Sequence, residues 1–166
     1  EFDVHRANGT AHPLMKHYGI DAAPMAHELI DEWRNPRAGI RYLHVPTNLI
    51  IFGGIDDVWR SASGELIIVD YKSTAKEADV NIDAPWQQSY KRQMEIYQWL
   101  FRKNGFEVQD TGYFVYVNGK TDREERRNRC CLLQSRCPNR WHYLRCAWQH
   151  NMERQDKRGR WFLVRL

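Results

Sequence analysis

Several features of other protein classes are missing from this sequence. No apolar run is long enough to cross a membrane as a helix, and the first residues lack the pattern of a signal peptide. No Cys occurs before Cys130, and no Cys-x-x-Cys pair suggests a structural zinc site. These absences favour a cytoplasmic protein with reduced thiols and no membrane association.

Length and the first residues set the expected scale of the fold. A chain of 166 residues suits one domain with a core of its own. The first residue is not Met, so we expect the sequence to be a piece of a longer protein. Glu1–Lys16 is then predicted to begin with the end of a truncated helix, which Asn8-Gly9-Thr10 terminates.

Charge is distributed unevenly along the chain. Residues 1–120 hold 13 Lys and Arg against 16 Asp and Glu, whereas residues 121–166 hold 12 against five. The first part is therefore slightly acidic, and the second is basic enough to attract a phosphate backbone. We predict one domain over residues 1–120 and a basic segment rich in Arg, Trp and Cys over residues 121–166.

The basic segment leaves two interpretations open. Arg interleaved with Trp and Tyr is typical of single-strand nucleic-acid binding, by backbone attraction and base stacking. The alternative is a poorly ordered appendage. The abrupt change of composition after Arg123 also suggests the hypothesis that the segment is not native to the domain before it. Within the segment, Trp161–Val164 has the pattern of a strand, and the spacings of the four Cys suggest no zinc site.

The most informative stretch runs from Gly53 to Thr74. Phe52–Trp59 and Glu65–Ser73 are rich in Ile, Val, Tyr and Trp, and Ser61-Ala62-Ser63-Gly64 between them has turn composition. A β-hairpin is the simplest interpretation. Both faces of the second strand are apolar until its end, which is typical of a central strand covered on both sides.

Charged residues stand at the end of this buried hairpin. Asp70 and Lys72 share one strand face because side chains alternate, whereas Glu65 falls on the opposite face and is interpreted as a solvated residue. Asp56 follows the apolar run of the first strand. Two carboxylates beside an ammonium suit a Mg²⁺ or Mn²⁺ site. The alternative is a structural Asp–Lys pair, with Asp56 as a turn residue.

A helix is predicted for Ala84–Asn104. Pro85 suits its first turn, Asp83 is a candidate N-cap, and Asn104-Gly105 supplies the stop signal. Gln93 and Tyr97 are four residues apart and therefore lie on one face. The polar stretch Lys76–Asp83 before the helix is either a plain connector or a loop that contacts substrate.

The order of these three parts resembles a known family. Asp56 follows Gly-Gly-Ile, Asp70-Tyr71-Lys72 comes fourteen residues later, and the helix with Gln93 and Tyr97 follows. This pattern, over roughly Tyr42 to Asn118, is similar to the PD-(D/E)xK nuclease superfamily and, within it, to the RecB-like branch. Ile55 stands where the family name has Pro.

The resemblance implies a fold and a set of roles. The implied fold is α/β, with a restriction-endonuclease-like αβββαβ core whose central mixed sheet is flanked by helices. The implied metal ligands are Asp56, Asp70 and the backbone carbonyl of Tyr71, with Mg²⁺ or Mn²⁺ as cofactor. Lys72 would orient the attacking water, and Gln93 and Tyr97 would brace the site as catalytic residues.

Further expectations depend on the same resemblance. RecB-like nucleases often carry a metal-binding His on an early helix, and His5 is the best-placed candidate, with a surface His as the alternative. Tyr90, Lys91 and Arg92 are candidates for nucleic-acid binding. The implied partners are DNA and, within repair or recombination, a helicase or other repair proteins. The early Cys of iron–sulfur members is absent.

The remaining elements are predicted from local patterns. Asp21–Arg37 has apolar residues at helical spacing and is predicted to form an amphipathic helix that ends at Asn35-Pro36. Ile40–Val45, Asn48–Ile51 and Val108–Asn118 have strand composition. A strand–helix–strand connection predicts that the last of these is parallel to the Asp70 strand.

Three functions remain in competition. The first is a metal-dependent DNA nuclease of RecB-like type in repair, recombination or defence. The second is a non-catalytic nucleic-acid-binding module that retains the nuclease fold within a larger complex, although the presence of Asp56, Asp70 and Lys72 argues against such decay. The third is a domain that acts on RNA ends or nucleotides.

Overall fold

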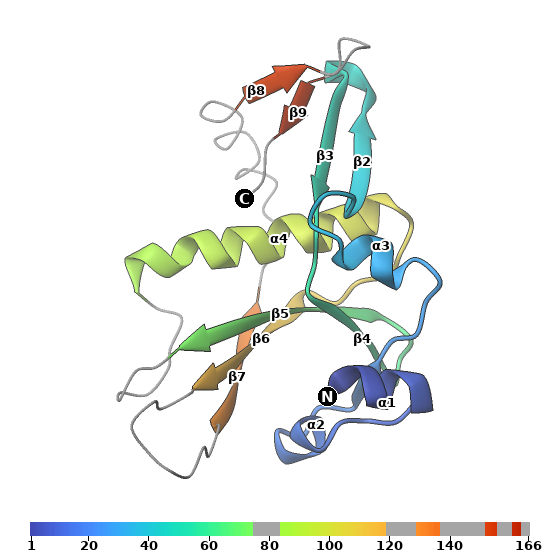
Figure 1. Ribbon diagram of the computed structural model, residues 1–166, viewed down its shortest axis with the longest axis vertical. Helices are drawn as coiled ribbons and strands as arrows, with labels where there is room; N and C mark the ends of the chain where they lie inside the picture. Colours follow the sequence, from blue (N-terminus) through green and yellow to red (C-terminus); the bar gives the residue numbers. More distant parts are fainter. Residues whose placement is uncertain (75–83, 119–128, 137–151, 156–160, 164–166) are drawn as a thin grey trace.

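The structure is a computed structural model that describes residues 1–74, 84–118, 129–136, 152–155 and 161–163 (Figure 1). Its central sheet has the strand order β1-β4-β5-β6-β7. These strands are β1 (Ala22–Pro24), β4 (Asp57–Ser61), β5 (Leu66–Thr74), β6 (Thr111–Asn118) and β7 (Arg129–Arg136). Only the β5–β6 pair is parallel among the described pairings of this sheet, so the sheet is mixed.

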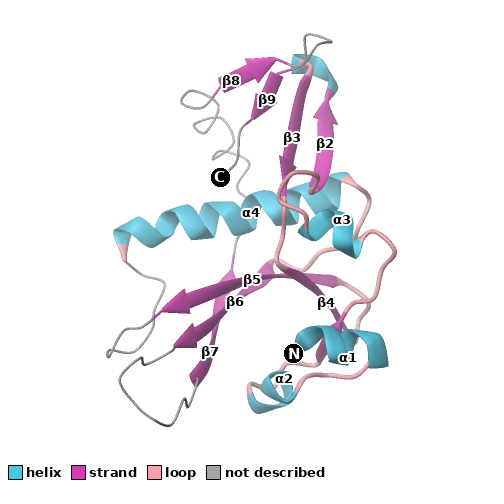
Figure 2. Ribbon diagram, in the orientation of Figure 1, coloured by secondary structure: helices cyan, strands magenta, loops and turns pink. Residues whose placement is uncertain are grey.

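Helices cover both faces of the central sheet (Figure 2). The long helix α4 (Gln88–Lys103) lies on one face and is preceded by a 3₁₀ turn, η2 (Pro85–Gln87). The short helices α1 (Phe2–Asn8) and α2 (Pro13–His17) lie on the other face. The elements α1, β1, β4, β5, α4 and β6 come in the chain order αβββαβ, with α2 inserted before β1 and with α3, β2 and β3 inserted between β1 and β4, and this order confirms the expected α/β fold class.

Strand β5 is buried from both sides, as its sequence predicts. Ile68 belongs to the core cluster that includes Met94 and Leu100 of α4. Val69, its neighbour, belongs to a second cluster with Met15 of α2. Alternate side chains of one strand therefore serve two cores, which is the arrangement that a strand apolar on both faces indicates.

A second sheet stands apart from the central one. It has the order β2-β3-β9-β8, with β2 (Ile40–His44), β3 (Leu49–Gly53), β8 (Met152–Gln155) and β9 (Trp161–Leu163). Helix α4 lies between the β2–β3 hairpin and the central sheet (Figure 1). The strands predicted at 40–45, 48–51 and 161–164 are thus confirmed with small shifts of their ends.

The prediction of one continuous strand over Phe52–Trp59 is wrong. β3 ends at Gly53 and β4 begins at Asp57, so the chain leaves one sheet and enters the other between them. A Cβ on Gly54 would lie only 2.9 Å from the Cα of Pro36, so the segment that connects the two sheets packs closely on a neighbouring loop. Glycine permits this close approach because it has no side chain.

The predicted helix over Asp21–Arg37 is also wrong. The segment forms strand β1, which pairs with β4, and then the short helix α3 (Ile30–Arg34). Main-chain pairing with β4 competes with helix formation at the start of this segment. The N–H of Met25 continues the pairing beyond β1 by donating to the carbonyl of Val58 at 2.9 Å. Met25 and Trp33 lie in the core as expected, whereas Leu29 is 41% exposed.

The C-terminal half of the sheet agrees with the predicted crossover. β6 is parallel to β5, with Asp70 opposite Phe114 in the register. The domain boundary at residue 120 stays a prediction. Strand β7, which lies after this boundary, pairs with the full length of β6, which lies before it. Asp83, the 76–83 loop, Cys137 and Cys146 lie outside the described residues, as do the side chains of Cys130 and Cys131. No helix in the described ranges is long and apolar enough to cross a membrane.

Candidate functional site

The strand register brings Asp56 and Asp70 together. Asp57 pairs with Val69 at the end of the antiparallel β4–β5 ladder, so Asp56 and Asp70 are the next residues along the two chains, and the Asp56 carboxylate is close enough to raise the pKa of Asp70. Side chains at opposite positions of such a ladder point to the same face, with Cβ atoms roughly 5 Å apart. The N–H of Tyr71 donates to Oδ2 of Asp56 at 2.7 Å, which fixes this carboxylate against β5.

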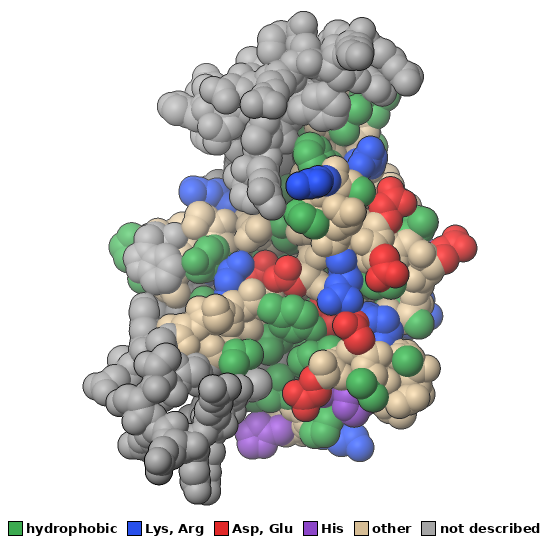
Figure 3. All heavy atoms as spheres, viewed as in Figure 1, with side chains coloured by type: hydrophobic (Ala, Val, Ile, Leu, Met, Phe, Trp, Pro, Cys, Tyr) green, Lys and Arg blue, Asp and Glu red, His purple; other side chains and the backbone are tan. Residues whose placement is uncertain are grey.

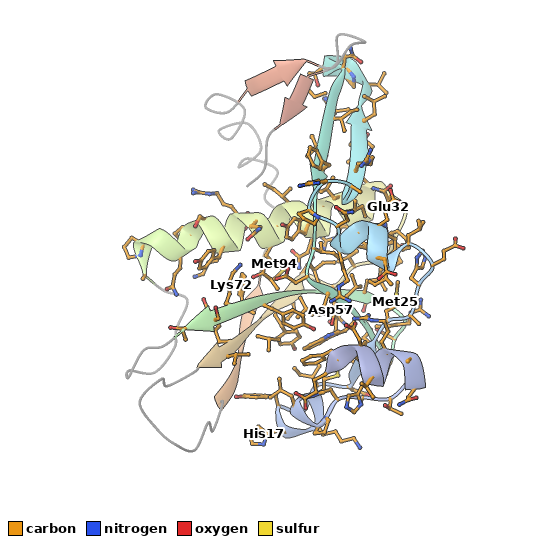
Figure 4. All side chains as sticks on the ribbon, viewed as in Figure 1. His17, Met25, Glu32, Asp57, Lys72 and Met94 are labelled. Carbon is orange, nitrogen blue, oxygen red and sulfur yellow. The ribbon has the colours of Figure 1, made fainter. Side chains whose placement is uncertain are left out.

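Lys72 completes this group on the same face, which is the one toward α4. Its Nζ lies 2.5 Å from Oδ2 of Asp70, and its side chain is 19% exposed. The same Nζ lies 4.5 Å from the ring centroid of Tyr90, at the start of α4. Figure 4 shows Lys72 between β5 and α4, and the space-filling view of Figure 3, from the same side, shows acidic and basic side chains next to each other on the surface.

Burial makes the charge on Asp70 costly. Asp70 is 4% exposed, and this burial is the main reason that its pKa rises to about 6. The hydrogen bond and charge of Lys72 lower the pKa, whereas the neighbouring Asp56 raises it. The group is therefore an electrostatically strained carboxylate that a nearby cation would stabilise in its ionised form.

Gln93 and Tyr97 meet on α4 as their spacing predicts. Nε2 of Gln93 donates to the hydroxyl of Tyr97 at 2.8 Å. The Tyr97 ring packs against Gly53, where an added Cβ would lie 2.5 Å from ring atom Cε1. This contact connects α4 to the end of β3, shortly before Asp56. The catalytic roles of Gln93 and Tyr97 stay predictions.

The other candidates lie in different settings. His5 is on α1, which covers the opposite face of the sheet, and its Nδ1 is 3.0 Å from the hydroxyl of Thr10. The structure therefore does not bring His5 to Asp56 and Asp70. Lys91 and Arg92 follow Tyr90 near the start of α4. Lys91 is half-buried and Arg92 is exposed.

A second charged group, which sequence reasoning missed, lies directly behind the first. Asp57 points to the face of the sheet that α1 covers, and it is fully buried. Arg6 of α1 and the hydroxyl of Tyr71 each donate to its carboxylate at 2.5 Å. Figure 4 shows Asp57 near α1. The alternation of side chains in β4 could have placed Asp57 on this face, but nothing in the sequence pairs it with Arg6.

The carboxylates facing α4 fit a small divalent cation. Within the described part of the chain, no group of three or more His, Cys, Asp or Glu side chains could hold a metal ion. Two carboxylates alone suit Mg²⁺ or Mn²⁺, which commonly take one or two protein carboxylates and complete their coordination with water and phosphate oxygens. Asp56 and Asp70 are thus the side chains that would hold such an ion.

Comparison with known proteins agrees with this geometry. Neither curated proteins nor solved structures gave a match to the chain. A family model described as the PD-(D/E)XK nuclease superfamily matches residues 6–130, about three quarters of the sequence. The matched range contains both carboxylates, Lys72 and all of α4. The chain belongs to the PD-(D/E)XK nuclease superfamily.

Proposed function

We propose that the chain is a Mg²⁺- or Mn²⁺-dependent DNA nuclease of RecB-like type that hydrolyses phosphodiester bonds. The observation that carries the proposal is that the Asp56 and Asp70 carboxylates lie close together just beyond the Asp57–Val69 pair, with Lys72 in contact with Asp70. Asp56, Asp70 and Lys72 occupy the positions that the superfamily's motif uses for chemistry. The proposed setting is DNA repair, recombination or defence, in a cytoplasmic complex that can include a helicase.

Each residue has a proposed part in the reaction. Asp56 and Asp70 hold the cation, with the backbone carbonyl of Tyr71 as a further ligand. A bound divalent cation supplies Lewis-acid stabilisation of a phosphoryl oxygen and lowers the pKa of water. Lys72 orients the attacking water and offsets the charge that develops on the phosphate, because its ammonium is a compact point charge.

The surroundings of Lys72 support this part of the proposal. The Tyr90 ring lies on one side of the ammonium and the Asp70 carboxylate lies at 2.5 Å. These contacts hold a flexible side chain in place, and so reduce the reorganisation needed during the reaction. Tyr90, with Lys91 and Arg92 on the following positions of α4, is proposed to contact the nucleic-acid backbone.

The test is cleavage of labelled single- and double-stranded DNA with Mn²⁺, with Mg²⁺ or with EDTA. We expect cleavage with either ion, none with EDTA and none from the Asp70→Asn variant. Glu65→Gln is the matched control, because Glu65 is an acidic residue at the other end of the same hairpin, bonded to Ser63 at 2.9 Å. This control should cleave like the unaltered protein.

The assay also separates the proposal from its main alternative. Salt-dependent DNA binding without cleavage in Mn²⁺ would indicate the non-catalytic module and contradict the nuclease. Cleavage that persists in EDTA or in Asp70→Asn would contradict the assigned site. Linear and circular DNA, compared side by side, would show whether the enzyme needs a free end, and labelled RNA would test the nucleic acid it prefers.

A further inference from the structure

The group behind the sheet contains a buried ion pair that the proposed reaction does not use. Nη2 of Arg6 is 2.5 Å from Oδ1 of Asp57, and the side chains are 9% and 0% exposed. Nη1 of Arg6 also donates to the carbonyl of Met25 at 2.7 Å. Burying two charges gains little stability over a well-packed apolar pair, so stability alone is a weak reason for this arrangement.

The connection of Asp57 to Tyr71 suggests another reason. The Tyr71 hydroxyl donates to Oδ2 of Asp57, and the Tyr71 N–H donates to Oδ2 of Asp56. One residue therefore connects the buried carboxylate behind the sheet to a carboxylate in front of it. Asp56 and Asp57 are sequence neighbours, as are Asp70 and Tyr71. The hydrogen bond between Asp57 and Tyr71 behind the sheet therefore also restrains Asp56 and Asp70 in front of it, through the backbone that joins each neighbour to the next.

We propose that Tyr71, held by Asp57 and Arg6, is a positioning residue that sets how Asp56 and Asp70 face a divalent cation. The inference rests on the proposed function, because it assigns a second layer of contacts to the same metal site. Outer contacts of this kind orient metal ligands, and their loss commonly lowers metal affinity by about 10- to 100-fold. Arg6 contributes from α1, so the N-terminal helix becomes part of the site's support.

The sharpest variant is Tyr71→Phe, which removes one hydroxyl and keeps the ring, the backbone carbonyl and the N–H. The measurement is Mn²⁺ binding to the full chain without DNA, followed by the electron paramagnetic resonance signal of the free ion. We expect the dissociation constant for Mn²⁺ to rise by about 10-fold or more. Cleavage should then reach half its maximum at a correspondingly higher Mn²⁺ concentration.

Tyr113→Phe is the matched control. Its ring belongs to the same rear cluster and stacks on Trp59 at a centroid distance of 5.8 Å. Removing its hydroxyl should leave Mn²⁺ affinity unchanged. Arg6→Lys is a second test from the other side of the pair, since it keeps the charge but loses the forked geometry, and it should weaken Mn²⁺ binding in the same direction.

The outcomes distinguish the inference from a purely structural role. A structural role would lower the active fraction at every Mn²⁺ concentration, whereas positioning shifts the concentration needed and is rescued by more Mn²⁺. Mn²⁺ affinity equal in Tyr71→Phe and the unaltered protein would overturn the inference and leave the proposed function intact. An unaltered protein that neither binds Mn²⁺ nor cleaves DNA would overturn the proposed function and the inference together.

Discussion

Two charged groups lie back to back at the end of the β4–β5 hairpin, and they differ in how their carboxylates are satisfied. In the rear group, Oδ1 of Asp57 accepts from Arg6 and from the N–H of Val58. Oδ2 accepts from Trp59 at 3.3 Å and from Tyr71. A carboxylate has about four acceptor positions, so this one is filled by the protein itself.

The front group is satisfied less completely. Asp70 has an ion pair with Lys72, and within the described residues its Oδ2 has no further side-chain or main-chain donor besides that ammonium. Its pKa is raised to about 6, with burial as the main cause. A carboxylate whose acceptor positions are taken supports structure, whereas one that is buried and incompletely paired is suited to receive a cation. The same residue type is thus in two different electrostatic settings on the two faces.

The largest expected contrast is in stability. Asp57→Ala should lower the free energy of unfolding by about 3 to 5 kcal/mol, because removing one partner leaves the Arg6 charge buried without its main counterion. Asp70→Asn should leave that free energy unchanged or raise it, since the buried charge is no longer required. Urea denaturation of both variants at pH 7.5 in EDTA measures the difference.

A control separates loss of the ion pair from loss of volume. Asp57→Asn keeps the size of the side chain and one oxygen acceptor, so its destabilisation should lie between those of Asp57→Ala and the unaltered protein. Equal stability of the Asp57→Ala and Asp70→Asn variants would show that the two faces do not differ in the way described above.

The sequence predicts the front group better than the rear one, for a physical reason. The front group depends on local order: alternation within β5, a four-residue turn, and the register that the turn imposes on Asp56 and Asp70. The Gln93–Tyr97 contact likewise follows from helical spacing. The resemblance to the nuclease superfamily joins these local signals into one site.

The rear group and the edge of the sheet depend on distant partners. Arg6 and Asp57 are 51 positions apart, and no periodicity connects them. Strand β1 consists of Ala22, Ala23 and Pro24, which have little strand propensity and become a strand through pairing with β4. The helical spacing of Met25 and Trp33 then misled the prediction, because both are core residues of a bent, mostly irregular segment.

The second prediction concerns pH and sharpens the contrast through Asp70. Its pKa is about 6 in the folded protein and near the ordinary 3.8 when unfolded. The folded state therefore binds this proton more strongly than the unfolded state. The stability that protonation of Asp70 contributes is complete below pH 4 and is lost as the pH rises through 6. The loss amounts to roughly 3 kcal/mol at most, at 1.36 kcal/mol for each pKa unit.

Denaturation from pH 4 to pH 8 in EDTA tests this expectation when Asp70→Asn is the reference. The stability of Asp70→Asn relative to the unaltered protein should increase between pH 4 and pH 6 and level off above pH 7. A difference that stays flat over this range would contradict the raised pKa. Added Mn²⁺ should stabilise the unaltered protein most at high pH, because the cation binds the ionised carboxylate.

The smallest expected effect tests how firmly the Lys72 ammonium in the front group is held compared with the Arg6 guanidinium in the rear group. Arg6 is fixed by several hydrogen bonds, whereas Lys72 has an ion pair and the face of the Tyr90 ring. A cation–π contact at a partly exposed site contributes about 1 kcal/mol, so Tyr90→Leu should slow single-turnover cleavage about fivefold at saturating Mn²⁺. Tyr90→Phe keeps the ring face and, with the DNA saturated by enzyme so that a weakened backbone contact does not limit the rate, should cleave nearly as fast as the unaltered protein. If both variants are slowed equally, the hydroxyl of Tyr90 matters and its ring face does not, and the hold on Lys72 has been assigned to the wrong part of the side chain.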